Sequence, residues 1–178
     1  MQVVKRFLVA TAPITISAIV AMILSPTYVR GHGNEKGTAT ASFQGGTVAI
    51  EYMRPTLKGR DLLSQITPGS YWRLGADQAT TLTTDVELRI GDGQSVAAGK
   101  YTLVLKFLGD DKWSLIIADG AARGSWEPQG LVAEVSMVTN KLDASVEALT
   151  IKLSSEENRG RLIIEWGETQ MVADFTAA

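Results

Sequence analysis

The chain has 178 residues, which suits one domain with a core that needs neither disulfides nor metals. Three of its 17 basic residues precede His32, and none of its 19 acidic residues does. The rest of the chain therefore has 14 basic and 19 acidic residues and a net charge of −5. This acidic balance argues against nucleic acid as a partner. The absence of cysteine excludes a disulfide framework, a thiol nucleophile and a cysteine zinc site.

The N-terminal segment has the pattern of a secretion signal. Lys5 and Arg6 precede residues 7–24, an apolar run of eighteen residues without a charge. The run is longer than in most cleaved signals and no clean Ala-x-Ala site follows it, so an uncleaved anchor is the alternative. We therefore expect residues 1–33 to be a signal peptide or a signal anchor with a short linker. The domain would lie in the periplasm or outside the cell, or be tethered to the inner membrane, and the membrane would be contacted only through this segment.

From Thr38 onward, apolar residues recur at every second position in short runs separated by turn residues. This period is typical of half-buried antiparallel strands. Two segments, 61–66 and, more weakly, 142–146, are predicted to form helical turns. The runs that predict strands are 48–52, 86–90, 101–107, 113–117, 131–137 and 149–153, with turns at 91–93 and 109–111.

The last two runs predict a tight hairpin. Residues 162–166 alternate toward Trp166, residues 171–175 alternate toward Phe175, and Gly167-Glu168 between them suits a two-residue type II′ turn. About nine strands with one apolar face each predict an all-β domain over residues 38–178. We expect an antiparallel, jelly-roll-like sandwich of two sheets with one long loop, and a sheet closed into a barrel is the alternative.

Three sequence blocks carry a family resemblance. They are Glu51-Tyr-Met-Arg-Pro-Thr-Leu-Lys-Gly-Arg60, Trp72-Arg-Leu-Gly-Ala-Asp-Gln-Ala-Thr-Thr81 and Ala98-Gly-Lys-Tyr-Thr-Leu103. In this order and spacing the chain resembles the bacterial family named domain of unknown function 2911 (DUF2911). The resemblance implies an exported, β-rich protein and implies no activity.

The chain also departs from the pattern of that family. Relatives tend to carry Phe-Gly where this chain has Leu62-Leu63, and Asn-Glu where it has Asp77-Gln78. A carboxylate that works as acid or base cannot be exchanged for an amide, which disfavours general acid or base catalysis at position 78.

Four cations lie within twenty residues of an otherwise acidic chain, at Arg54, Lys58, Arg60 and Arg73. Guanidinium groups bind carboxylate or phosphate with two hydrogen bonds, so a convergent cluster would bind an anionic small molecule or an acidic glycan. The competing interpretation is that these cations hold a long loop by pairing with carboxylates and backbone carbonyls.

Tyr71 and Trp72 beside Arg73 could form a stacking platform for a sugar or a cation–π contact, and the alternative is that Trp72 plugs the end of the core. The candidate ligand site in the loop over residues 54–81 therefore comprises Arg54, Lys58, Arg60, Trp72, Arg73 and Asp77. His32 is the only histidine and precedes the domain, so neither a Ser-His-Asp triad nor a histidine metal site is expected, and no cofactor is predicted.

These observations favour an exported binding or structural domain without catalytic activity. The rival hypothesis is an exported, glycosidase-like hydrolase that uses Glu51 with Asp61 or Asp77 as a carboxylate pair. A third hypothesis is a membrane-tethered module of an envelope assembly.

Overall fold

The computed structural model describes residues 34–178, and the leader predicted for residues 1–33 lies outside them. Within the described range, no helix has the length and apolar character needed to cross a membrane. Only one helical turn, the 3-10 helix η1, is present there, and it confirms the turn predicted for residues 61–66. The elements are β1 (Glu35–Phe43), β2 (Gly46–Arg54), η1 (Leu63–Gln65), β3 (Tyr71–Arg73), β4 (Thr80–Thr84), β5 (Leu88–Ile90), β6 (Gln94–Val96), β7 (Gly99–Gly109), β8 (Lys112–Ala121), β9 (Pro128–Glu156) and β10 (Arg159–Ala177).

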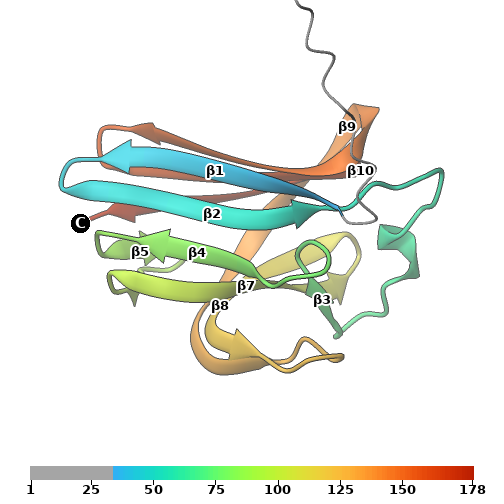
Figure 1. Ribbon diagram of the computed structural model, residues 1–178, viewed down its shortest axis with the longest axis horizontal. Coiled ribbons are helices and arrows are strands. Elements are labelled where there is room, and N and C mark those ends of the chain that lie inside the picture. Colours follow the sequence, from blue (N-terminus) through green and yellow to red (C-terminus); the bar gives the residue numbers. More distant parts are fainter. Residues whose placement is uncertain (1–33) are drawn as a thin grey trace, which may run out of the picture. The chain divides into compact units, whose positions relative to one another are not determined.

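The strands pair in one antiparallel sheet with the order β1-β2-β4-β7-β8-β9-β10-β5-β6, and β3 adds to β7 (Figure 1). The all-β class and the antiparallel pairing are thus confirmed. A separation into two sheets is not confirmed, because the long strand β9 pairs first with β8 and then with β10. The sheet is therefore continuous through β9.

Strand β10 folds back on itself at Gly167, which confirms the predicted hairpin. Arg161 forms an ion pair with Asp174 in the same strand, at 2.6 Å between Nε and Oδ1, and the amide of Ala177 donates to the carbonyl of Asn158 at 2.8 Å. Residues so far apart in sequence meet only if the strand reverses direction. Gly167 has a φ of 59°, the left-handed value that a type II′ turn needs at its first central position. In Figure 1 the C-terminus accordingly lies on the same side as the turn between β9 and β10.

Strand β9 runs past both arms of this hairpin. Residues 138–141 pair with the second arm and residues 146–156 pair with the first, with register shifts on either side of Gly167. The weak helical prediction for residues 142–146 is wrong, because this segment continues the strand. Pairing with two arms in succession keeps the backbone extended where the local sequence also permits a helical turn.

Contacts of β2 with the second half of β9 bring distant parts of the sheet together. The amide of Leu149 donates to the carbonyl of Pro55 at 2.9 Å. The buried hydroxyl of Tyr52 donates to the carbonyl of Ile151 at 3.4 Å and accepts from its amide at 2.9 Å. The sheet therefore curls around its apolar face.

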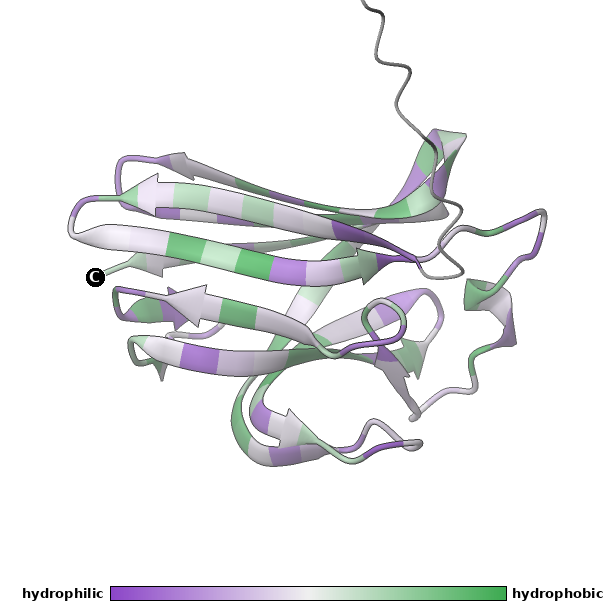
Figure 2. Ribbon diagram, viewed as in Figure 1, coloured by the Kyte–Doolittle hydropathy of each residue, from purple (hydrophilic) through white to green (hydrophobic). Residues whose placement is uncertain are grey.

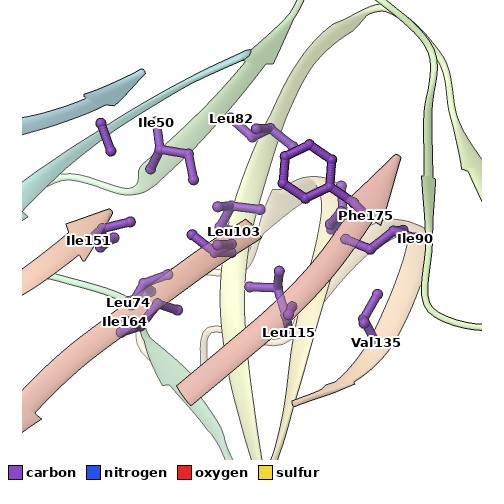
Figure 3. Packing of buried hydrophobic residues seen from close by; sticks show 14 of the residues in the cluster. Ile50, Leu74, Leu82, Ile90, Leu103, Leu115, Val135, Ile151, Ile164 and Phe175 are labelled. Carbon is purple, nitrogen blue, oxygen red and sulfur yellow. The ribbon is translucent and has the colours of Figure 1, made fainter. Parts of the chain in front are cut away.

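That apolar face forms one large core. Figure 2 shows hydrophobic and hydrophilic residues alternating along the strands, and Figure 3 shows Ile50, Leu103 and Ile164, from β2, β7 and β10, converging. Leu131 is an exception, since it is 58% exposed although the alternation predicts it to be buried. A bulge opposite Ile117 and Ala118 inserts one residue into β9 and turns Leu131 outward.

Glu165 is a buried carboxylate in the first arm of β10. Lys152 Nζ donates to it at 2.7 Å and Gln170 Nε2 at 2.8 Å, and the hydrogen bond from Lys152 is the main reason why the pKa of Glu165 is lowered. We expect Glu165→Gln to reduce the free energy of unfolding by about 1 kcal/mol at pH 7.

The effect of this substitution should depend on pH. A lowered pKa in the folded state stabilises the protein above the ordinary pKa of 4.5, and this stabilisation is lost as the pH falls through the lower folded value. Urea unfolding of both proteins at pH 7 and near pH 3 measures the difference. A penalty of equal size at both pH values would contradict this account.

Candidate functional site

The segment that joins β2 to β4 carries two of the three family blocks and is held close to β2. Gly75 lies so near β2 that a Cβ atom placed on it would be 3.0 Å from the carbonyl oxygen of Met53. The hydroxyl of the buried Thr80 donates to the carbonyl of the fully buried Leu74. These contacts give the block at residues 72–81 a role in packing.

The structure does not gather the four predicted cations into one cluster. Arg54 donates through Nε to the carbonyl of Leu149 at 3.2 Å and pairs through Nη1 with Glu35 at 3.0 Å. Lys58 is exposed, and its amide donates to the carboxylate of Glu147 at 2.8 Å. Both residues therefore tie the loop and the edge of β2 to neighbouring strands.

Arg60 is committed to its own loop. Its Nε donates to the carbonyl of Leu57 at 3.0 Å and its Nη2 donates to the carbonyl of Thr56 at 3.4 Å. Such bonds satisfy backbone oxygens that a loop leaves without partners. Arg60, like Arg54, has the contacts that the loop-holding interpretation predicts.

Trp72 and Arg73 point to opposite faces of β3, as successive strand residues must. Trp72 packs against the main core, whereas the Arg73 guanidinium carbon lies 5.0 Å from the ring centroid of Trp126. Trp126 and Tyr71 cover a small second core over Val104 on the other face of the sheet. Trp72 therefore packs against the core, as the plug interpretation predicts, and does not share a surface with Arg73.

The three carboxylates considered for hydrolysis have separate surroundings. Glu51 accepts from Lys36 at 2.7 Å, and this hydrogen bond is the main cause of its lowered pKa. The pKa of Asp77 is also lowered, chiefly by its side-chain hydrogen bond with Asn34 at 2.9 Å. Asp61 precedes η1 and accepts from the amide of Ser64 at 3.2 Å. Carboxylates held in their charged form do not supply the proton that a general acid needs.

The same loop does line a cavity, which we call the loop pocket. It has a volume of about 590 Å³, within the usual range for small-molecule sites. Among the predicted site residues only Arg60 contributes to it. The loop supplies Leu57, Arg60, Asp61, Leu62, Leu63 and Ser64, and the strands supply residues that include Phe107, Asp111, Trp113, Thr139, Lys141, Ser145, Trp166 and Glu168.

An aromatic cluster forms the inner wall of the loop pocket. Trp166 stacks on Trp72 with 5.3 Å between ring centroids, and Trp72 meets Trp113 edge-on at 6.3 Å. Phe107 lies 4.7 Å from Trp113 and is half-buried, so it is the aromatic ring that the pocket exposes most. The two lining tryptophans are almost fully buried, which makes the wall rigid.

Thr139 supplies the most informative polar group of the loop pocket. Its hydroxyl is buried and, within residues 34–178, has no hydrogen-bond partner. A buried hydroxyl without a partner costs about 1–3 kcal/mol, so native proteins seldom keep one. Thr139 lines the pocket and is half-buried, so a rotation of its side chain about χ1 would turn this hydroxyl toward a bound molecule.

The charges around the loop pocket nearly cancel, with two cations against three carboxylates. Lys141 pairs with Glu168 at 3.2 Å, and the remaining charges are those of Arg60, Asp61 and Asp111. In the described part of the chain, no group of three or more histidine and acidic side chains is arranged to hold a metal ion. The pocket therefore offers hydrogen-bonding groups and an apolar wall rather than a strong field of one sign.

The residues of the loop pocket that sequence reasoning missed come from β7, β8, β9 and β10. Phe107 and Trp113 flank the β7–β8 turn, Thr139 lies in the part of β9 that pairs with the second arm of β10, and Trp166 precedes the turn of β10. Phe107, Trp113 and Trp166 belong to runs that the alternation predicts, and Thr139 follows the predicted run 131–137. Only the strand order, which local patterns do not contain, brings these turns to one place.

Comparison with known proteins places the chain in a family. No curated protein and no solved structure shows a significant match to it. The model of the family described as protein of unknown function (DUF2911) matches residues 34–175. The chain therefore belongs to the DUF2911 family.

Proposed function

We propose that this protein is an exported, non-catalytic binding domain that holds a neutral, hydroxyl-rich molecule of saccharide size in the loop pocket. The observation that carries the proposal is the buried, unpartnered hydroxyl of Thr139 in a pocket of about 590 Å³ beside an aromatic wall. A sugar presents hydroxyl groups at its edges and apolar C–H groups on its faces. It therefore matches a pocket with hydrogen-bonding groups on one side and apolar groups on the other.

The charges favour a neutral glycan over an anionic ligand in this pocket. Arg60 donates through Nε and Nη2 to backbone carbonyls and Lys141 pairs with Glu168, so both cations of the lining are partly engaged by other groups. Asp61 and Asp111 add negative charge to the lining. With Glu168 the lining holds three carboxylates against two cations, which disfavours an anion.

The apolar side of the pocket supports the same ligand class. Phe107, Leu62 and Leu63 are half-buried and line the cavity, so their exposed parts are free to contact the face of a sugar ring. Their neighbours Trp113 and Trp166 are fixed in the core and hold the wall in place. A rigid wall reduces the entropy lost on binding.

The absence of catalysis is proposed from the carboxylates. Of Glu51, Asp61 and Asp77, only Asp61 lines the loop pocket. The lowered pKa values of Glu51 and Asp77 disfavour the protonated acid that glycoside cleavage requires.

Export is proposed from the apolar run at residues 7–24. The mass of the protein purified from its own host tests this part, because signal cleavage would remove roughly thirty residues.

Thr139→Val tests the pocket directly, since it replaces the hydroxyl by a methyl group of similar shape. We expect the variant to be more stable than the parent by about 1 kcal/mol, because the unpartnered hydroxyl is gone. We also expect it to bind saccharides about tenfold more weakly, because a hydrogen bond to the ligand is lost. Urea unfolding measures the first effect, and calorimetric titration with a panel of neutral mono- and disaccharides measures the second.

Thr102→Val is the matched control. Thr102 is half-buried in β7 and does not line the loop pocket, so its substitution should leave saccharide binding unchanged. Equal binding by parent protein and Thr139→Val, or a parent protein that binds no neutral saccharide of the panel, would refute the proposed function.

A further inference from the structure

A second groove differs from the loop pocket in its chemistry, because its lining is rich in arginine. It has a volume of about 800 Å³ and shares no residue with the loop pocket. We call it the arginine groove. Its charged and hydroxyl-bearing lining includes Arg89, Ser154, Arg159, Arg161, Asp174 and Thr176.

Strand pairing explains why these residues meet. Arg161 in the first arm of β10 lies opposite Ser154 of β9 and forms an ion pair with Asp174 of the second arm. Arg89 of β5 lies opposite Thr176 of that second arm. The groove therefore crosses four neighbouring strand segments, and its three arginines come from two parts of the chain that are far apart in sequence.

The ion pair of Arg161 fixes its guanidinium group in a useful orientation. Nε donates to one carboxylate oxygen of Asp174 at 2.6 Å and Nη2 donates to the other at 3.0 Å. This side-on contact leaves the N–H groups of Nη1 for another acceptor. Because Asp174 already holds the guanidinium, an anion that binds to it loses less side-chain entropy.

The other two arginines add accessible positive charge. Arg159 is exposed and forms no ion pair within residues 34–178, and Arg89, with 59% of its side chain exposed, makes one contact with Glu87 at 3.2 Å. Against these three cations the lining contains the carboxylates of Glu156 and Asp174. The groove is thus locally positive on a domain whose overall charge is negative, so an anion is attracted to this place more than to the rest of the surface.

We propose that the arginine groove is a binding site for a small organic molecule with at least two carboxylate or phosphate groups. Arg159 and Arg161 lie on β10 and Arg89 lies on β5, so a molecule with two such groups can use both sides of the groove. The hydroxyls of Ser154 and Thr176 provide further donors to the same oxyanions. This site is independent of the saccharide binding proposed for the loop pocket, and the two proposals stand or fall separately.

The test uses citrate as the carboxylate probe and pyrophosphate as the phosphate probe, titrated calorimetrically at low ionic strength. We expect the parent protein to bind at least one of them, and the probe that binds more tightly identifies the oxyanion. Arg159→Gln and Arg89→Gln should each weaken binding about tenfold, because each removes a charge-assisted hydrogen bond. Both side chains are exposed, so the melting temperature should stay close to that of the parent.

Arg123→Gln is the control for net charge, since Arg123 is an exposed arginine outside the groove. It removes the same charge and should leave anion affinity nearly unchanged. The proposal is overturned if neither probe binds, or if Arg123→Gln weakens binding as much as the two groove variants do. Saccharide binding by Arg159→Gln should equal that of the parent, which separates a failure of this site from a failure of the loop pocket.

Discussion

Replacing Trp166 by alanine is expected to lower the free energy of unfolding by about 3–5 kcal/mol, the largest effect of any single substitution considered for this domain. Trp166 is 1% exposed and is stacked on Trp72. Its indole N–H donates to the carbonyl of Glu147 at 3.2 Å. Alanine would leave a cavity at the place where β9, β10 and the loop meet. Urea unfolding followed by far-ultraviolet circular dichroism measures the loss.

Trp126→Ala is the matched control, because it removes the same side chain from the small outer core. Trp126 is half-buried and contacts Arg73 and the cluster around Val104. Its loss should cost markedly less than the loss of Trp166, because less apolar surface is removed from a buried site. Equal penalties for the two substitutions would show that the aromatic cluster does not anchor the main core.

The parts of the fold that the sequence predicts are those set by neighbours along the chain. Alternation in residues 48–52 correctly predicts the buried face of β2, because side chains in a strand point to alternate faces. Gly167-Glu168 correctly predicts a hairpin, because the turn type depends on two residues. The predicted burial of Leu131 is wrong because of the pairing with β8. A bulge there turns Leu131 to the other face of the sheet, although the sequence alternation continues through it.

The order of the strands in the sheet cannot be predicted from neighbours along the chain, because it depends on pairing between distant segments. Residues 131–137 and 149–153 read as two strands, yet the chain continues between them as one strand with two successive partners. Nothing local in residues 142–146 shows that β8 and β10 pair with β9 in turn. Whether the strands form two separate sheets depends on these pairings, which the local sequence does not show.

The residues that line the loop pocket also come together through pairing between distant segments, which local sequence patterns do not contain. Local sequence groups Trp72 with Arg73, but the two side chains point to opposite faces of β3. Trp72 packs against the main core, and Arg73 contacts Trp126 of the small second core. Arg60 lines the loop pocket, and its guanidinium holds the loop. Thr139 has no distinguishing sequence pattern, and its importance comes from burial without a hydrogen-bond partner.

Gly75→Ala should have the second large effect, a loss of about 2–4 kcal/mol in the free energy of unfolding, because two costs combine. Gly75 has a φ of 123°, a backbone conformation that residues with a side chain rarely adopt. Its new Cβ atom would also lie 3.0 Å from the carbonyl oxygen of Met53 and 3.1 Å from the hydroxyl of Thr80. These are main-chain and fully buried neighbours, so they cannot move aside easily.

Gly59→Ala separates the two costs. Gly59 also has a positive φ, of 72°, but a Cβ atom there would meet nothing within 4 Å. Its substitution should therefore cost only the backbone strain, about 1 kcal/mol. If both variants unfold at the same urea concentration, close packing of Gly75 against β2 does not stabilise the domain. If Gly75→Ala is much less stable than Gly59→Ala, this block of the family sequence serves to hold the loop against the sheet.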